Sequence, residues 1–112
     1  MAVQVTEKQQ GEVLVVGIEG RLDAATTPVV ERKLSEKIEG GATKLVLNFA
    51  GVDYLSSAGM RLLLTVSKKL AALKGKMALS NVSDEVMEVI KMAGFDRVLD
   101  IHATETDALG SF

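Results

Sequence analysis

The sequence predicts an α/β fold in which a mixed β-sheet is flanked by helices, in the order β-β-α-β-α-β-α-β-α. Short runs rich in valine, isoleucine and leucine alternate with longer segments whose apolar residues recur every three or four positions. Only a turn separates the first two short runs, which indicates an antiparallel hairpin. Helical segments separate the later runs, which indicates parallel pairing and helices packed against the sheet.

Strands are expected at residues 3–7, 12–19, 44–49, 76–80 and 97–101. A turn at Gln9-Gln10-Gly11 closes the hairpin between the first two. The second run shows little alternation between apolar and polar residues, which is typical of a strand buried on both faces. Gly20-Arg21-Leu22-Asp23 then leaves this strand.

The first two helices each begin and end at recognisable residues. Thr27 is expected to be the N-cap of the first helix, with Pro28 at the first helical position, and Gly40-Gly41 ends it. The second helix is expected from about Ser57 to Lys74, because its apolar residues form a wide face over that stretch.

The last two helices carry acidic residues in their first turns. Ser83 is expected to cap the third helix, with Asp84 and Glu85 at its positive end, and Gly94 closes it. Thr104-Glu105-Thr106-Asp107 resembles a capping-box start of a short final helix.

Composition narrows the function classes. The 112 residues predict one domain over 1–112, and the absence of cysteine excludes disulfides, thiolate zinc sites and thiol nucleophiles. A net charge of −2 and 4% aromatic residues argue against a nucleic-acid partner. The N-terminus does not resemble a signal peptide, and no apolar run approaches the roughly 20 residues that span a bilayer. We therefore expect no membrane insertion and a cytoplasmic location.

The segment with the strongest functional signal is Val52-Asp53-Tyr54-Leu55-Ser56-Ser57-Ala58-Gly59-Met60-Arg61-Leu62-Leu63-Leu64. Its two serines lie where a strand gives way to a helix. A hydroxyl at this point is held close to free backbone N–H groups, which favour a phosphate. From the residues alone, a simple N-cap role for Ser56 is favoured over a phosphate-accepting one.

Catalysis and ligand binding are poorly supported, so we expect no enzyme, no metal and no cofactor. A serine nucleophile needs a nearby base, and the one histidine, His102, is expected just after the last strand. The Gly-x-Ser-x-Gly elbow of hydrolases is absent, because Leu55 stands at its first glycine. No glycine-rich phosphate loop occurs. Turn and cap roles best explain the scattered aspartates Asp23, Asp53, Asp100 and Asp107.

From Gly20 onward the chain resembles a STAS domain, and specifically a stand-alone bacterial anti-sigma factor antagonist. The motifs that carry the resemblance cover nearly the whole chain in the family's order. They are Gly20-Arg21-Leu22-Asp23, Leu45-Val46-Leu47-Asn48, Tyr54-Leu55-Ser56-Ser57-Ala58-Gly59-Met60-Arg61 and Met92-Ala93-Gly94-Phe95.

The resemblance implies a phosphorylation-switched binding module, monomeric when free. In this family the unphosphorylated form binds a serine kinase that is also the anti-sigma factor, and so frees a sigma factor; a phosphoserine phosphatase resets the phosphorylated form. The family's acceptor is two residues before the motif glycine, which here is Ser57 before Gly59. The implied partner-binding residues are Asp23, Ser56, Ser57, Ala58, Gly59, Met60 and Arg61.

Two further implications concern Ser56 and the target. Many members have an acidic residue directly before the acceptor, whereas this chain has Ser56, which is therefore a second candidate acceptor. The Ser-Ser-Ala-Gly form also occurs in members whose targets are not sigma factors. The alternative function is a regulator or structural subunit of a non-sigma system, for example a lipid-transport complex or the regulation of secretion.

Overall fold

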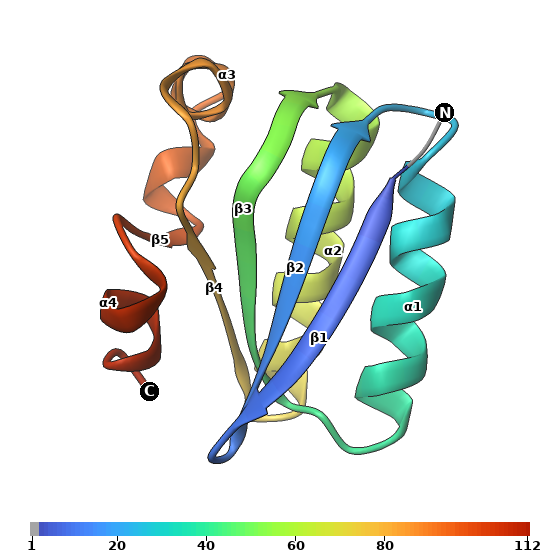
Figure 1. The fold of residues 1–112 in the computed structure, drawn as a ribbon, viewed down its shortest axis with the longest axis vertical. Helices are drawn as coiled ribbons and strands as arrows, with labels where there is room; N and C mark the ends of the chain where they lie inside the picture. The colour runs from blue at the N-terminus through green and yellow to red at the C-terminus, as the bar shows by residue number, and fades with distance from the viewer. Residues whose placement is uncertain (1–2) are drawn as a thin grey trace.

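The computed structural model describes residues 3–112 and contains a five-stranded mixed sheet (Figure 1). The strands are β1 (Gln4–Gln10), β2 (Val13–Leu22), β3 (Lys44–Leu55), β4 (Lys76–Ser80) and β5 (Asp100–His102). They lie side by side in sequence order, β1 antiparallel to β2 and the other pairs parallel. The predicted fold class and element order are confirmed.

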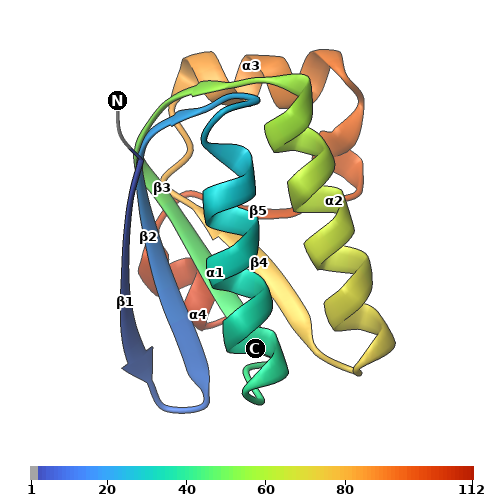
Figure 2. The ribbon, with the colours of Figure 1, turned by 90° about the vertical axis from the view of Figure 1, so that its right-hand side faces the viewer.

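The helices form layers on the two faces of the sheet. They are α1 (Thr27–Glu39), α2 (Ser57–Ala72), α3 (Asp84–Met92) and α4 (Glu105–Leu109), with a short 3₁₀ helix, η1 (Phe95–Arg97). Helices α1 and α2 cover one face and α4 lies on the other, while α3 lies near the carboxyl ends of β3 and β4 (Figures 1 and 2). Within residues 3–112, none of the helices is long and apolar enough to cross a bilayer.

The face beneath α1 and α2 holds the main core. Alternate residues of β2 and β3, together with the apolar faces of α1, α2 and α3, form one continuous buried cluster. Phe49, Leu63 and Leu70 are among its most deeply buried members, each 1% exposed or less. The core continues to the carboxyl ends of the strands through Leu22 and Leu55. The head of α2 therefore rests on packed apolar side chains.

The opposite face has a much smaller apolar cluster. It consists of Val13, Val15, Val46, Ala78 and Ala108, with Leu109 packed against it. Because β2 contributes to both clusters, the expectation that this strand is buried on both faces is confirmed for residues 13–16.

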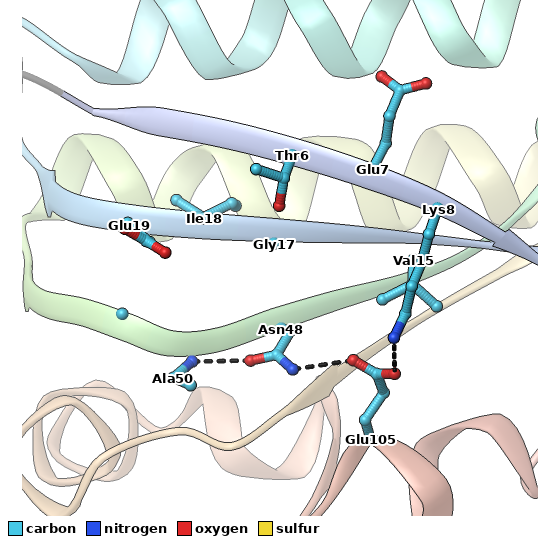
Figure 3. Close-up of a pocket in the computed structure, with 11 residues that line it drawn as sticks. Thr6, Glu7, Lys8, Val15, Gly17, Ile18, Glu19, Asn48, Ala50 and Glu105 are labelled. Carbon is cyan, nitrogen blue, oxygen red and sulfur yellow. Dashed lines mark hydrogen bonds and ion pairs between the residues drawn. The ribbon is translucent and has the colours of Figure 1, made fainter.

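Polar contacts hold α4 against this second face. The carboxylate of Glu105 accepts a hydrogen bond from Asn48 Nδ2 at 2.9 Å and pairs with Lys8 Nζ at 2.9 Å (Figure 3). Beyond the end of α4, Lys76 Nζ donates to the backbone oxygen of Ser111 at 2.8 Å and pairs with Asp100 at 2.9 Å. Polar contacts thus anchor both ends of α4.

The last strand differs from its prediction. Residues 97–101 were expected to be extended, but Phe95–Arg97 form η1 and β5 covers Asp100–His102. Gly94, at φ 80°, ends α3 in the left-handed region, and the carbonyl of Phe95 then accepts from the N–H groups of Val98 and Leu99. Because of these turn-forming bonds, the strand begins and ends later in the chain than expected. His102 is therefore its last residue rather than the residue after it.

Other boundaries also moved. Strand β1 continues to Gln10, and the turn lies at Gly11, whose φ is 62°. Strand β3 continues six residues beyond Phe49, because it pairs with the end of β2 after a register shift. The N-cap of α1 is Thr26 rather than Thr27, and its hydroxyl binds Asp23 N and Arg21 O instead of capping the helix.

Candidate functional site

The two serines lie at the junction of β3 and α2, at the edge of the sheet where the parallel strands end (Figure 1). Strand β3 ends at Leu55 and α2 begins at Ser57. Ser56, between them, has an extended backbone and donates its N–H to the carbonyl of Leu22 at 2.9 Å. This hydrogen bond fixes the head of α2 to the end of β2.

The hydroxyl groups of the two serines have different roles. Ser56 is half-buried, and its Oγ accepts from Gly59 N at 3.3 Å as the N-cap of α2. Ser57 is exposed, and within residues 3–112 its hydroxyl makes no hydrogen bond. The cap role that the sequence favoured for Ser56 is confirmed, and the Ser57 hydroxyl is free for chemistry.

Gly59 allows α2 to approach the strand ends closely. A Cβ atom at this position would lie 2.7 Å from Leu55 Cδ1, which is shorter than real Cβ contacts, and 3.0 Å from Leu22 Cβ, which is tighter than most of them. The motif glycine therefore has a packing role, which positions the serines relative to β2. The sequence marks the glycine but does not reveal the side chains that surround it.

The first turn of α2 is suited to a negative group. It contains no acidic residue, whereas the first turn of α3 contains Asp84 and Glu85. The N–H groups of the first residues of a helix have no acceptor in the helix itself, and the helix dipole is positive at this end. A phosphoryl group on Ser57 would meet this positive end rather than a carboxylate of the same turn.

An apolar groove of about 340 Å³ lies between α2 and α3, directly beside Ser57. Its lining residues are Ser56, Ser57, Met60, Arg61, Leu64, Val89, Ala93 and Phe95. The α3 side also exposes large apolar side chains, Val89 at 40% and Met92 at 83%. The sequence analysis did not predict that Val89, Ala93 and Phe95 line a groove beside Ser57. The signal that could have indicated it is the presence of apolar residues on an outward face of α3.

Asp23 lies on the loop after β2, one residue beyond Leu22, whose carbonyl holds Ser56. Its Oδ1 accepts from the N–H groups of Thr26 and Ala25, each at 3.0 Å. The bond from Thr26 above all, helped by that from Ala25, keeps the pKa of the Asp23 carboxyl below its ordinary value. Asp23 thus shapes the loop next to the serines while remaining ionised.

Arg21 and Tyr54 form a surface pair beside this loop. The Arg21 guanidinium lies 4.1 Å from the centre of the Tyr54 ring, and its Nε is 3.8 Å from Asp23 Oδ2. The two residues are register partners on β2 and β3. They add a fixed cation and an exposed aromatic ring to the same end of the sheet.

The remaining predicted residues of the motif divide between core and surface. Met60 is only 5% exposed yet lines the groove, and Ala58 is half-buried. Arg61 is exposed and lines both this groove and a smaller hollow of about 230 Å³ between α1 and α2. The structure thus gathers the motif residues and Asp23 at one end of the sheet.

A family model described as STAS domain matches residues 4–108. The chain belongs to the STAS domain family. The resemblance found in the sequence is therefore confirmed over nearly the whole chain.

Among STAS relatives, the anti-sigma-B factor antagonist of Bacillus subtilis is 28% identical, over 92% of this chain and 94% of its own length. RsfB of Mycobacterium tuberculosis, named an anti-sigma-F factor antagonist, is also 28% identical, over 96% of this chain and 88% of its own. The solved structure of the anti-sigma factor antagonist SpoIIAA in its unphosphorylated form matches with a TM-score of 0.79 at 29% identity, covering 96% of this chain and 93% of that one.

A structure of SpoIIAA in the phosphorylated form also matches, with a TM-score of 0.72 at 28% identity over 98% of both chains. This STAS chain is therefore similar to a protein whose structure is known in both states of phosphorylation.

Proposed function

We propose that this STAS domain protein, acting as a single module over residues 1–112, is an anti-sigma factor antagonist switched by phosphorylation of Ser57. In its unphosphorylated form it binds a serine kinase that is also the anti-sigma factor, and thereby frees a sigma factor. The observation that carries this proposal is the division of roles between the serines. The Ser56 hydroxyl caps α2, whereas the Ser57 hydroxyl is exposed and unbonded. The names of the relatives support the same function.

The partner is proposed to dock on the surface around the head of α2. This surface comprises Asp23, Ser56, Ser57, Ala58, Gly59, Met60 and Arg61. The apolar groove beside Ser57 supports this placement, because burying apolar side chains is the main source of affinity in such contacts. A phosphoserine phosphatase would act on the same exposed position. The protein itself is proposed to bind and not to catalyse, since among residues 3–112 no basic side chain hydrogen-bonds to the Ser57 hydroxyl.

Phosphorylation is proposed to act by exclusion, without refolding. It adds about −1.5 to −2 charges beside an apolar groove. A docked partner must desolvate this charge or face it with its own groups, and either cost shifts affinity by orders of magnitude. The positive end of α2 tolerates the charge, so the helix itself remains folded.

The test is to incubate the protein with its cognate kinase and ATP and to map the phosphopeptide. We expect phosphate on Ser57, and persistent binding of the kinase by Ser57→Ala. The control is Ser56→Ala, which removes the cap but leaves the acceptor, and so should still be phosphorylated. Phosphate on Ser56 alone, or none on either serine, would contradict the proposal. Stable co-purification with a transport subunit without any phosphorylation would favour the non-sigma function instead.

A further inference from the structure

Arg61 is an exposed cation in the first turns of α2. Among residues 3–112 no carboxylate lies within ion-pair distance of its guanidinium, whereas other basic side chains such as Lys8, Lys37 and Lys76 are paired. An exposed arginine loses little free energy by remaining solvated, so the lack of an ion pair does not by itself indicate a function. The evidence for a function is the position of Arg61 relative to Ser57.

Arg61 lies four residues after Ser57 on α2. Residues four apart are neighbours on the surface of a helix, and a negative group N-terminal to a positive one is the favourable order. Both residues line the groove between α2 and α3, so their side chains border the same space. A phosphoryl group has three acceptor oxygens, and the planar guanidinium can donate two parallel hydrogen bonds to them.

We propose that Arg61 is the counter-ion of the phosphoryl group on Ser57 and holds it in one position at the head of α2. This inference rests on the proposed phosphorylation of Ser57. It assigns Arg61 a positioning role in the phosphorylated state, in addition to any contact with a partner in the unphosphorylated state.

The surroundings leave Arg61 free for this role. On the α3 side of the groove the lining residues Val89, Ala93 and Phe95 are apolar, and the first turn of α2 has no carboxylate. On the α1 side the hollow between α1 and α2 contains one acidic residue, Glu31, which forms no ion pair with Arg61. Among the residues that line these two hollows, Glu31 is therefore the one carboxylate that could compete with the phosphate for Arg61.

A consequence follows for the switch. In the unphosphorylated form Arg61 is available to a carboxylate of the partner. In the phosphorylated form the phosphoryl group occupies the same guanidinium, so the partner loses a hydrogen-bond donor that it can contact in the unphosphorylated form. The added charge of about −1.5 to −2 and the loss of this donor both oppose binding of an acidic partner surface.

The experiment needs no kinase. Phosphoserine is incorporated at position 57 during translation, and the ³¹P resonance is followed against pH. A nearby cation favours the dianion and lowers the titration midpoint. We therefore expect the midpoint of Arg61→Gln to lie about half a pH unit above that of the parent, with Arg61→Lys between them because it keeps the charge but not the planar fork.

The matched control is Lys68→Gln, which removes one positive charge from an exposed position on the same face of α2. Eleven residues from Ser57, it lies about 16 Å along the helix, beyond the screening length of about 8 Å at physiological salt. Its midpoint should match that of the parent. Equal midpoints for Arg61→Gln and the parent, or equal shifts for Arg61→Gln and Lys68→Gln, would overturn the proposal. Neither result depends on whether a kinase naturally uses Ser57, so this failure is distinct from failure of the proposed function.

Discussion

The two faces of the sheet are held by different interactions. Beneath α1 and α2 a continuous apolar cluster extends from Leu14 near the start of β2 to Leu55 at the end of β3. Beneath α4 the apolar cluster is small, and polar contacts add to the attachment: Glu105 binds Lys8 and Asn48, and Lys76 donates to Ser111. The serine motif is mounted on the strongly packed face. We therefore expect a new charge at Ser57 to change the charge of the surface without unfolding α2.

The largest expected effect is the loss of a core leucine on the strongly packed face. Leu63 is 1% exposed within α2, and Leu63→Ala should reduce the free energy of unfolding by about 2–5 kcal/mol. Leu109, half-buried on the α4 face, is the matched control, and Leu109→Ala should cost about 1 kcal/mol. Urea unfolding monitored by circular dichroism measures both. Equal losses would show that the two faces contribute alike.

Next in size is the tight contact at the head of α2. Gly59→Ala places a methyl group against Leu55 and Leu22, and should cost about 1–3 kcal/mol of stability through overpacking. It should also displace the amide resonances of Ser56 and Ser57 in an ¹H–¹⁵N spectrum.

The glycine control comes from the weakly packed face. At Gly110, after α4, the nearest atoms to an added Cβ lie 3.5 Å away, and Gly110→Ala should leave stability nearly unchanged. A Gly59→Ala protein as stable as the parent would mean that the head of α2 is less rigid than we infer.

The third prediction separates exclusion from unfolding. Ser57→Asp should weaken binding of the cognate kinase by about 1–3 kcal/mol, because a docked partner must desolvate the new carboxylate or face it with its own groups. Its melting temperature should stay nearly constant, since an acidic residue at the start of a helix is tolerated. Ser57→Asn is the uncharged control of the same shape. A steep fall in melting temperature with loss of helical signal would mean that α2 unfolds and that exclusion is not the mechanism.

The smallest effect concerns the polar anchor of α4. The hydrogen bond from Asn48, followed by the contact with Lys8, keeps the pKa of Glu105 below its ordinary value of 4.5. A lowered carboxyl pKa stabilises the fold above that value, and this stabilisation is lost as the pH falls through the folded-state pKa. Glu105→Gln should therefore cost about 0.5–1 kcal/mol at neutral pH.

The difference between Glu105→Gln and the parent should disappear in acid, at pH values below the lowered pKa of Glu105, and it should shrink in high salt. Urea midpoints of both proteins across pH and ionic strength measure this. A difference that persisted unchanged in acid would mean that Glu105 contributes through packing rather than charge.

Local signals predicted much of this fold, and contacts distant in sequence explain the rest. The element order follows from hydrophobic periodicity, and the caps at Ser83 and Thr104 are confirmed because a cap needs only its own turn. The end of β3 was placed too early, since pairing with β2 rather than its own apolar run extends it to Leu55. Apolar patterning could not reveal η1, which depends on the turn after Gly94.

The candidate site was predicted only in part, because the sequence signals residues that are adjacent in the chain and not contacts between distant ones. Ser57, Arg61 and their neighbours are contiguous in sequence, so a single motif indicated them together. The opposite wall of the groove lies some 30 residues further on, and no pattern in α3 or η1 connects Val89 or Phe95 with a serine on another helix. The division of roles between Ser56 and Ser57 also required the backbone, because both residues are good caps in principle.

The capping role of Ser56 affects the local charge of the unphosphorylated and phosphorylated forms. Serine and aspartate cap a helix almost equally well, so α2 does not require either one in particular. Where a family member has an acidic residue at this position, the local charge is already about −1 before phosphorylation and about −3 after it. Here the cap is neutral, and the same event takes the charge on residues 56 and 57 together from about 0 to about −2. In the resting state these two residues therefore add no negative charge beside Arg61, and an acidic partner surface meets no repulsion from the cap itself.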